Sequence, residues 1–190
     1  RVAHNATRSA LSAKVGSPDR QIDSYFALVQ NDIGLQLIAE AFADKARRLL
    51  TEQLPANSPL HKLPLLSAAT PFKTGGPAGS EHYCHIDVGP IAKRNVSSLY
   101  SHTDRLCLMH INGACLRAWL EQSACVFNQI NAGAQDAPLL DPRFPGYMFD
   151  VIPQLTYAIN LSQPPRFNVR RGLLNRAAQR IEDLRHNGKL

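Results

Sequence analysis

The chain has 190 residues, 44% of them hydrophobic, with a net charge of +6 and a pI near 9.4. This composition excludes a chain that is disordered along most of its length, and no apolar run approaches the roughly 20 residues of a membrane span. The chain opens on Arg1 with a polar run, as a piece cut from a longer protein would. Its densest basic cluster, from Arg166 to Lys189, lacks the interleaved aromatic residues of a nucleic-acid reader, so we expect a solvated basic face.

The first third of the chain predicts a connector, a helix and a loop. Residues 1–22 are largely polar and small and are expected to lead into the domain. A helix is predicted over Asp32–Leu50, where apolar residues recur every three to four positions behind a side chain that can cap the start. A short strand over Leu65–Ala69 then delivers Pro71–Gly76, where proline and two glycines end regular structure and favour a ligand-facing loop.

The middle of the chain predicts two further helices around one strand. The first helix covers Ile91–Leu99, behind a proline whose missing N–H is harmless at a helix start. The continuous apolar run within Arg105–Ile111 is typical of a buried strand. The second helix covers Ala114–Asn128. The long loop Gln129–Ile152 follows, and loops of such length in a compact domain are often functional.

Two strands are predicted near the end of the chain. Leu155–Ser162 alternates apolar and polar residues, as a half-exposed strand does. Arg180–Arg185 precedes Asn187-Gly188, a pair that favours a hairpin turn, although Leu174–Leu184 also has helical spacing. The chain stops before a return strand can form, which predicts truncation there. These elements indicate an α+β fold, in which helices pack on a mixed β-sheet made of the four predicted strands.

The cysteines and histidines do not form a metal-binding pattern. The four cysteines lack Cys-x-x-Cys spacing, and we expect free, mostly buried thiols. His82, Cys84 and His85 lie close together, but no second cluster supplies the other ligands of a structural zinc site. Phosphate-binding glycine motifs and nucleophile-elbow serine motifs do not occur. The residues therefore predict no metal ligand in this chain, and the absence of a catalytic residue is implied only by the resemblance described below.

Two loop side chains are candidate ligand contacts. Lys73 is flanked by flexible backbone and can reach an anionic or hydroxyl-rich ligand, although a solvated loop lysine explains it equally simply. His102 follows a helix end, where its ring can stack on a base or cover the edge of the core. The residues by themselves lead to an α/β domain with a ligand loop.

Six segments carry a resemblance to one family: Ser24–Val29, Leu66–Gly76, Arg94–Tyr100, Trp119–Ala124, Gly146–Ile152 and Asp183–Lys189. In this order they resemble the C-terminal domain of bacterial 2',3'-cyclic-nucleotide 2'-phosphodiesterase/3'-nucleotidases. The resemblance implies that residues 23–190 form a 5'-nucleotidase-like substrate-binding domain, incomplete at its C-terminus. It also implies that residues 1–22 connect to a missing N-terminal metallophosphoesterase domain in a periplasmic enzyme of nucleotide catabolism.

The same resemblance assigns roles within the chain. Phe72, Lys73, Gly75 and Gly76 match the loop that approaches the nucleoside sugar, and His102 replaces a tyrosine that stacks on the base. The second stacking ring of the family lies beyond residue 190. The implied partners are a nucleotide or nucleoside substrate and the N-terminal domain, with no nucleic acid and no membrane.

The catalytic groups and two divalent metal ions are implied for the missing domain, and no cofactor is implied here. We therefore expect an inactive substrate-binding fragment of a phosphoesterase. Two alternatives stay open, a non-catalytic module of the same fold that has lost nucleotide recognition, and a basic nucleic-acid-binding domain.

Overall fold

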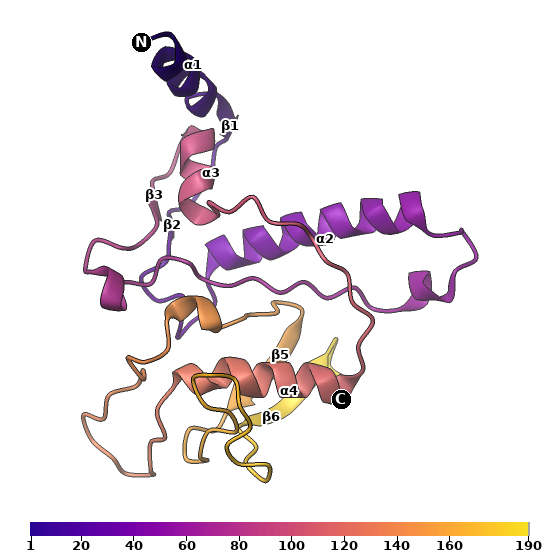
Figure 1. The fold of residues 1–190 in the computed structure, drawn as a ribbon, viewed down its shortest axis with the longest axis vertical. Helices are drawn as coiled ribbons and strands as arrows, with labels where there is room; N and C mark the ends of the chain where they lie inside the picture. Colours follow the sequence, from indigo (N-terminus) through magenta and orange to yellow (C-terminus); the bar gives the residue numbers. More distant parts are fainter. Residues whose placement is uncertain (190) are drawn as a thin grey trace.

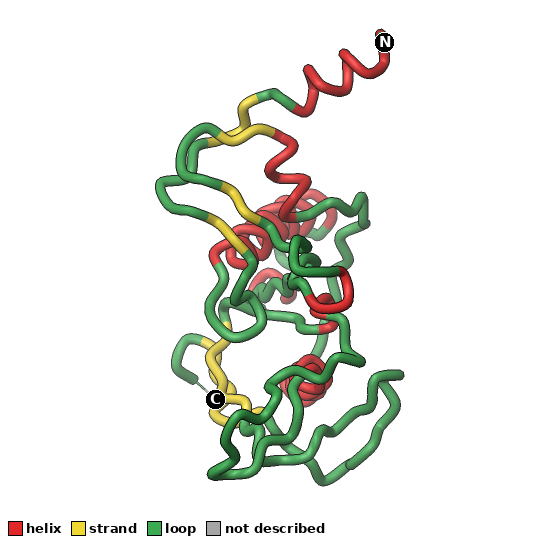
Figure 2. Tube along the Cα trace, turned by 90° about the vertical axis from the view of Figure 1, so that its left-hand side faces the viewer, coloured by secondary structure: helices red, strands yellow, loops and turns green. Residues whose placement is uncertain are grey.

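The computed structural model describes residues 1–189, apart from the side chain of Pro77. Figure 1 shows three tiers, with α1 (Val2–Leu11) and α3 (Lys93–Leu99) at one end and α2 (Ile33–Gln53) across the middle. The third tier contains α4 (Gly113–Ser123) and the strand pair β5–β6. Strands are short pieces among long loops, and α1 extends from one end of the molecule (Figure 2). None of the helices in the described residues combines the length and apolarity of a membrane-spanning helix.

The strands form three separate two-stranded antiparallel sheets within residues 1–189. The pairs are β1 (Lys14–Gly16) with β4 (Ile91–Ala92), β2 (Ile22–Asp23) with β3 (His85–Ile86), and β5 (Leu155–Ile159) with β6 (Ile181–His186). The α+β class is therefore confirmed, but the four predicted strands do not join in one mixed sheet. Only the last two of them, which became β5 and β6, pair with each other.

Helix α2 confirms the prediction for Asp32–Leu50 and continues to Gln53. The side chain of Asp32 caps its start by accepting a hydrogen bond from the Leu35 N–H at 2.7 Å. The buried face of the helix, with its own partly buried Phe42, packs against Ala27, Ala69 and the partly buried Leu99. This contact places α2 directly beneath the loop that begins after Ala69.

Helix α4 is also confirmed, although its regular part ends at Ser123 and a 3₁₀ turn continues it to Val126. Asn112 caps it by accepting from the Cys115 N–H at 2.9 Å. Its inner face packs on the β5–β6 pair through a core of Leu120, Ala124, Ile152, Leu155 and Ile181. The apolar periodicity of the sequence thus selects the face that meets the sheet.

Glu121 and Arg180, which we call the buried polar node, hold α4 to the start of β6. Glu121 is 1% exposed, and its carboxylate accepts hydrogen bonds from the N–H groups of Arg180 and Ile181 at 2.9–3.0 Å. The fully buried Arg180 guanidinium donates to the carbonyl oxygens of Gln163, Ala124 and Phe127 at 2.8–3.0 Å. Burial lowers the pKa of Arg180, against the opposing effects of Cys125 and Glu121. The two charges lie close but bind backbone rather than each other.

Two predicted strands are wrong. Leu65–Ala69 is extended, but only Ala69 pairs, in an isolated bridge to Val151 with bonds of 2.8–2.9 Å. Arg105–Ile111 is not a strand and is not buried, since Leu108 is 43% exposed and Met109 66% exposed. An extended run becomes a strand only when a neighbouring backbone takes its hydrogen bonds, and residues 1–189 offer none to this segment.

The cysteine prediction holds in part, because all four thiols are free but only Cys84 and Cys125 are buried. Cys107 and Cys115 are exposed: Cys107 lies in the segment where the predicted strand did not form, and Cys115 lies in the first turn of α4. At the chain end, Asn187 and Gly188 have φ values of 51° and 73°, and His186 pairs with Lys189. Positive φ at both central residues is the signature of a hairpin turn, so the predicted turn is confirmed.

Residues 1–22, predicted as a connector, contain regular structure. Helix α1 occupies Val2–Leu11, and none of its residues is buried. The strand β1 then pairs with β4, so that this part of the chain is fastened to the segment before α3. Ile22, the last of these residues, is 4% exposed and packs with Cys84 and Ile86.

Candidate functional site

Three rings from two separate loops meet beside α2, and we call Phe72, Tyr100 and His102 the aromatic cluster. The Phe72 and His102 ring centroids lie 4.5 Å apart with an interplanar angle of 47°. Tyr100 lies edge-on to Phe72 at 5.3 Å and edge-on to Phe42 of α2 at the same distance. The structure thus brings together two of the predicted site residues, one half-buried (Phe72) and one exposed (His102).

Tyr100 orients the segment that carries His102. Its hydroxyl donates a hydrogen bond of 2.9 Å to Oδ2 of Asp104, two residues beyond the histidine. Burial raises the pKa of Tyr100, and the neighbouring Asp104 carboxylate raises it further. Because the tyrosine stays protonated and donating, it helps to fix the segment that holds the imidazole against Phe72.

Lys73 points inward in this structure. Its ammonium donates to the hydroxyl of Ser98 at 3.0 Å, and its carbonyl oxygen accepts from Ser24 Oγ at 2.6 Å. The same Ser24 oxygen accepts from the Cys84 N–H at 2.8 Å. Burial raises the pKa of the Cys84 thiol, while the Ser98 hydrogen bond and the Lys73 charge oppose that shift.

Lys73, Ser98 and Cys84 line a cavity of about 20 Å³. That volume holds about one water molecule and not a nucleoside. The geometry therefore gives Lys73 a role in anchoring the loop, and no direct contact with a ligand is visible for its ammonium.

The two glycines of the loop differ in what surrounds them. Gly75 has φ +66°, its N–H donates to the His82 carbonyl at 2.7 Å, and a Cβ there would overlap the Tyr83 hydroxyl. Gly76 has φ +63°, but a Cβ there would meet open space. Both positions need a residue that tolerates positive φ. Only Gly76 leaves room on its exposed side for an approaching ligand.

A hydrogen-bonded relay lies beside this loop, and the sequence did not indicate it. The Tyr25 ring packs on the Tyr83 ring in a tilted arrangement, with centroids 5.1 Å apart, and its hydroxyl lies 3.1 Å from His85 Nδ1. The other ring nitrogen of His85 lies 3.2 Å from Asp87 Oδ1. Tyr25 and His85 are 60 positions apart, so spacing alone offers no signal for their contact. Within residues 1–189 no group of three or more potential ligands is positioned to hold a metal ion.

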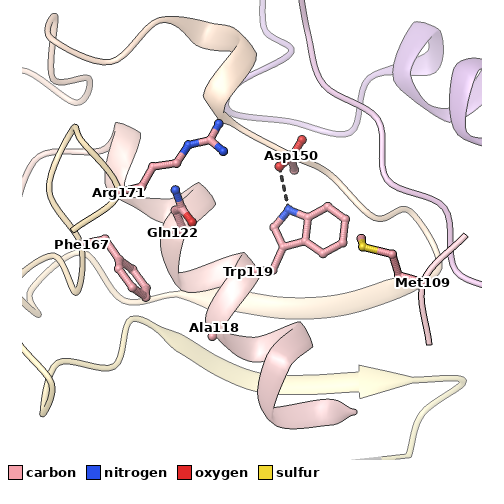
Figure 3. A pocket seen from close by; sticks show the side chains of 7 residues that line it. All are labelled: Met109, Ala118, Trp119, Gln122, Asp150, Phe167 and Arg171. Atoms are coloured by element: carbon pink, nitrogen blue, oxygen red, sulfur yellow. Dashed lines mark hydrogen bonds between the residues drawn. The ribbon is translucent and has the colours of Figure 1, made fainter. Parts of the chain in front are cut away.

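A larger cavity of about 360 Å³ lies elsewhere, over the outer face of α4. Its walls include Trp119, Met109 and Phe167, with Asp150 and Arg171 among its polar groups (Figure 3). The indole N–H donates to Asp150 Oδ2 at 2.7 Å. Burial raises the pKa of Asp150, opposed by that hydrogen bond and by the Arg171 charge. None of the five predicted site residues lines this cavity, although Trp119 belongs to a segment that carried the resemblance.

Comparison with known proteins gives the chain a family. The sequence profile described as "5'-nucleotidase, C-terminal domain" matches residues 30–189. The chain is 35% identical to a 2',3'-cyclic-nucleotide 2'-phosphodiesterase/3'-nucleotidase of Yersinia enterocolitica, over 98% of this chain and 28% of that protein. It is also 35% identical to the Salmonella typhimurium protein of that name, over 98% and 29% respectively.

The trifunctional nucleotide phosphoesterase protein YfkN of Bacillus subtilis is 33% identical, over 98% of this chain and 12% of that protein. No solved structure matches the chain. The chain thus spans less than a third of the length of each of these relatives, and it is a fragment by comparison with them. Its matched region and its α+β architecture lead to one assignment: the chain belongs to the 5'-nucleotidase C-terminal domain family.

Proposed function

We propose that this chain is the substrate-holding domain of a phosphoesterase that hydrolyses 2',3'-cyclic nucleotides and 3'-nucleotides. Support comes from the family and from relatives whose names state that activity. The structural observation that carries the proposal is the Phe72–His102 ring pair at 4.5 Å, one ring of which is exposed to solvent. The hydrolytic activity is proposed for the whole protein, and residues 1–190 alone are expected to be inactive.

In this proposal the base stacks on the aromatic cluster. Base–aromatic stacking is worth about 1–3 kcal/mol and tolerates different bases, because every base has a π-face. His102 supplies the exposed ring, and the half-buried Phe72 packs against that ring on the side of the core. Gly76 allows the loop backbone to approach the sugar, whereas Lys73 and Gly75 hold the loop in shape through Ser98 and His82.

The resemblance also implies two divalent metal ions, and the residues of this chain do not fit them. Within the described part of the chain no cluster of His, Cys, Asp and Glu offers three ligands at one point. We therefore assign the metal ligands to another part of the protein. The contribution of this chain is to bind and orient the nucleoside, which converts an encounter into a positioned reaction. A periplasmic location is also proposed, on the resemblance alone.

The test uses the metal-loaded full-length protein and 3'-AMP. Replacing His102→Ala should raise KM by about 5- to 150-fold, the equivalent of about 1–3 kcal/mol, with kcat changed by less than about twofold. His102→Phe should keep KM near that of the parent, because it retains a ring. The control His4→Ala removes an exposed histidine of α1, far along the chain from the cluster, and should change neither constant.

Two outcomes would count against the proposal. An unchanged KM for His102→Ala would remove the aromatic cluster from the binding site. Calorimetry that detects no heat with 3'-AMP at millimolar concentration would favour the alternative, a binding module of the same fold without nucleotide recognition. This alternative stays open because His102 stands where the resemblance implies a tyrosine that stacks on the base.

A further inference from the structure

A phenol hydroxyl lies against the backbone of the loop Pro71–Gly76. Tyr83 pairs with Thr74 in an isolated antiparallel bridge, and its hydroxyl lies so close to Gly75 that a Cβ there would overlap it. At the next position, Gly76, a Cβ would meet open space. The hydroxyl therefore lies beside the open part of the loop, where the proposed function places the sugar.

The Tyr83 hydroxyl has no hydrogen-bond partner among the residues that the structure describes. The ring is half-buried, but the hydroxyl is not a buried orphan, because the buried side-chain atom without a partner in this part of the chain is Nη2 of Arg180. The oxygen of Tyr83 thus reaches solvent with its hydrogen-bonding capacity unused. It can both donate to and accept from a hydroxyl of a ligand.

The other polar side chains of the loop are already engaged. The Lys73 ammonium donates to the Ser98 hydroxyl at 3.0 Å. The Thr74 hydroxyl lies against the backbone of Gly146, where a Cβ would overlap it. Tyr83 therefore offers the loop a polar group that these two residues do not.

The Tyr83 ring is held in place from two sides. On one side the Gly75 N–H donates to the carbonyl of the preceding residue, His82, at 2.7 Å. On the other side lies the Tyr25 ring, whose own hydroxyl is 3.1 Å from His85 Nδ1. A hydroxyl that is fixed before the ligand arrives loses little freedom on binding, so its hydrogen bond contributes more to affinity.

The chemistry of the proposed substrates indicates which sugar hydroxyl meets Tyr83. In a 2',3'-cyclic nucleotide the 2'- and 3'-oxygens are both esterified, which leaves the 5'-hydroxyl as the free hydroxyl of the sugar. A 3'-nucleotide has free 2'- and 5'-hydroxyls, so the 5'-hydroxyl is the one that both substrates share. We propose that Tyr83 binds the 5'-hydroxyl of the nucleoside and so selects nucleotides in which this hydroxyl is free. This inference rests on the proposed function.

Calorimetry with the full-length protein tests the contact, because adenosine and 5'-deoxyadenosine differ only in the 5'-hydroxyl. The parent should bind adenosine about 2- to 12-fold more tightly, the gain expected from one neutral hydrogen bond. Tyr83→Phe should lose this gain and bind the two nucleosides with equal affinity. The preference for adenosine over 2'-deoxyadenosine should be the same in both proteins. Since the deleted hydroxyl makes no hydrogen bond to the described residues, the Tm of Tyr83→Phe should stay within about 2 °C of the parent.

Tyr25→Phe is the matched control, because it deletes a hydroxyl that faces His85 rather than the loop. It should keep the preference for adenosine over 5'-deoxyadenosine. A parent protein without this preference would overturn the proposal, and so would a Tyr83→Phe protein that retains it. A parent that neither binds adenosine nor hydrolyses 3'-AMP would overturn the proposed function as well. Hydrolysis of 3'-AMP together with equal affinity for the two nucleosides would overturn the role of Tyr83 alone.

Discussion

Replacing Glu121→Gln tests whether the buried polar node holds α4 to β6. In the parent, the carboxylate accepts three contacts from two backbone N–H groups at 2.9–3.0 Å, and it is the negative charge beside the buried Arg180. Glutamine has similar size but no charge, and its NH₂ group must face an N–H donor. The change therefore removes acceptor capacity and charge while nearly preserving volume.

The expected cost is about 3–5 kcal/mol, the range measured when one member of a buried charge pair is removed and the other stays uncompensated. For a chain of this size about 2–4 °C of Tm corresponds to each kcal/mol, so Tm should fall by about 6–20 °C. The control Glu40→Gln neutralises an exposed glutamate of α2 and should shift stability by less than about 0.5 kcal/mol.

Thermal denaturation followed by Trp119 fluorescence measures the effect, since this is the only tryptophan of the 190 residues and lies on the same helix. The double variant Glu121→Met with Arg180→Met replaces both charges by apolar side chains. It should cost clearly less than the sum of the two single changes, because neither partner is left charged and buried. Equal Tm values for Glu121→Gln and Glu40→Gln, or strict additivity in the double variant, would refute the reasoning.

Two further predictions concern the loop and the cavity. Gly75→Ala should lower the free energy of unfolding by about 2–3 kcal/mol, because the strain of a positive φ and the overlap with Tyr83 add together. Gly76→Ala should lower it by only about 1 kcal/mol, because there only the positive φ opposes the new side chain. Equal losses for the two variants in chemical denaturation would contradict this prediction. The raised pKa of Asp150 means that stability falls as pH rises from the unfolded value near 3.8 through the folded value. The fluorescence of Trp119 should change with pH as Asp150 ionises, with a midpoint above pH 3.8, and Asp150→Asn should abolish that transition. An identical titration in the variant would exclude Asp150 as its source.

Helices are the most predictable part of this fold, because the residues that specify a helix lie close together in the sequence. In α2 and α4 the cap and the apolar face lie within one stretch of sequence, and Asp32 and Asn112 both make the capping bonds. Strands depend on a distant backbone instead. The apolar run of Arg105–Ile111 is suited to burial, but the described residues supply no partner, so the pattern could not predict its exposure.

The candidate site likewise combines features that local sequence predicts with contacts that depend on residues far apart in the chain. The proline and glycines of Pro71–Gly76 predict the loop, and the resemblance links this loop to His102, in agreement with the 4.5 Å contact between the Phe72 and His102 rings. The inward direction of Lys73 could not be predicted, because it depends on Ser98 from a helix 25 positions away. The contact between Tyr25 and His85 could not be predicted for a similar reason, since it follows only from the antiparallel pairing of β2 with β3.

The pairing of β1 with β4 has a consequence for synthesis on the ribosome. Lys14 pairs with Ala92, so the first strand leaves the exit tunnel long before its partner is made. At elongation rates of about 5–20 residues per second, this interval is on the order of ten seconds. During that time β1 has no ladder to join, and its unpaired backbone is open to chaperones and proteases.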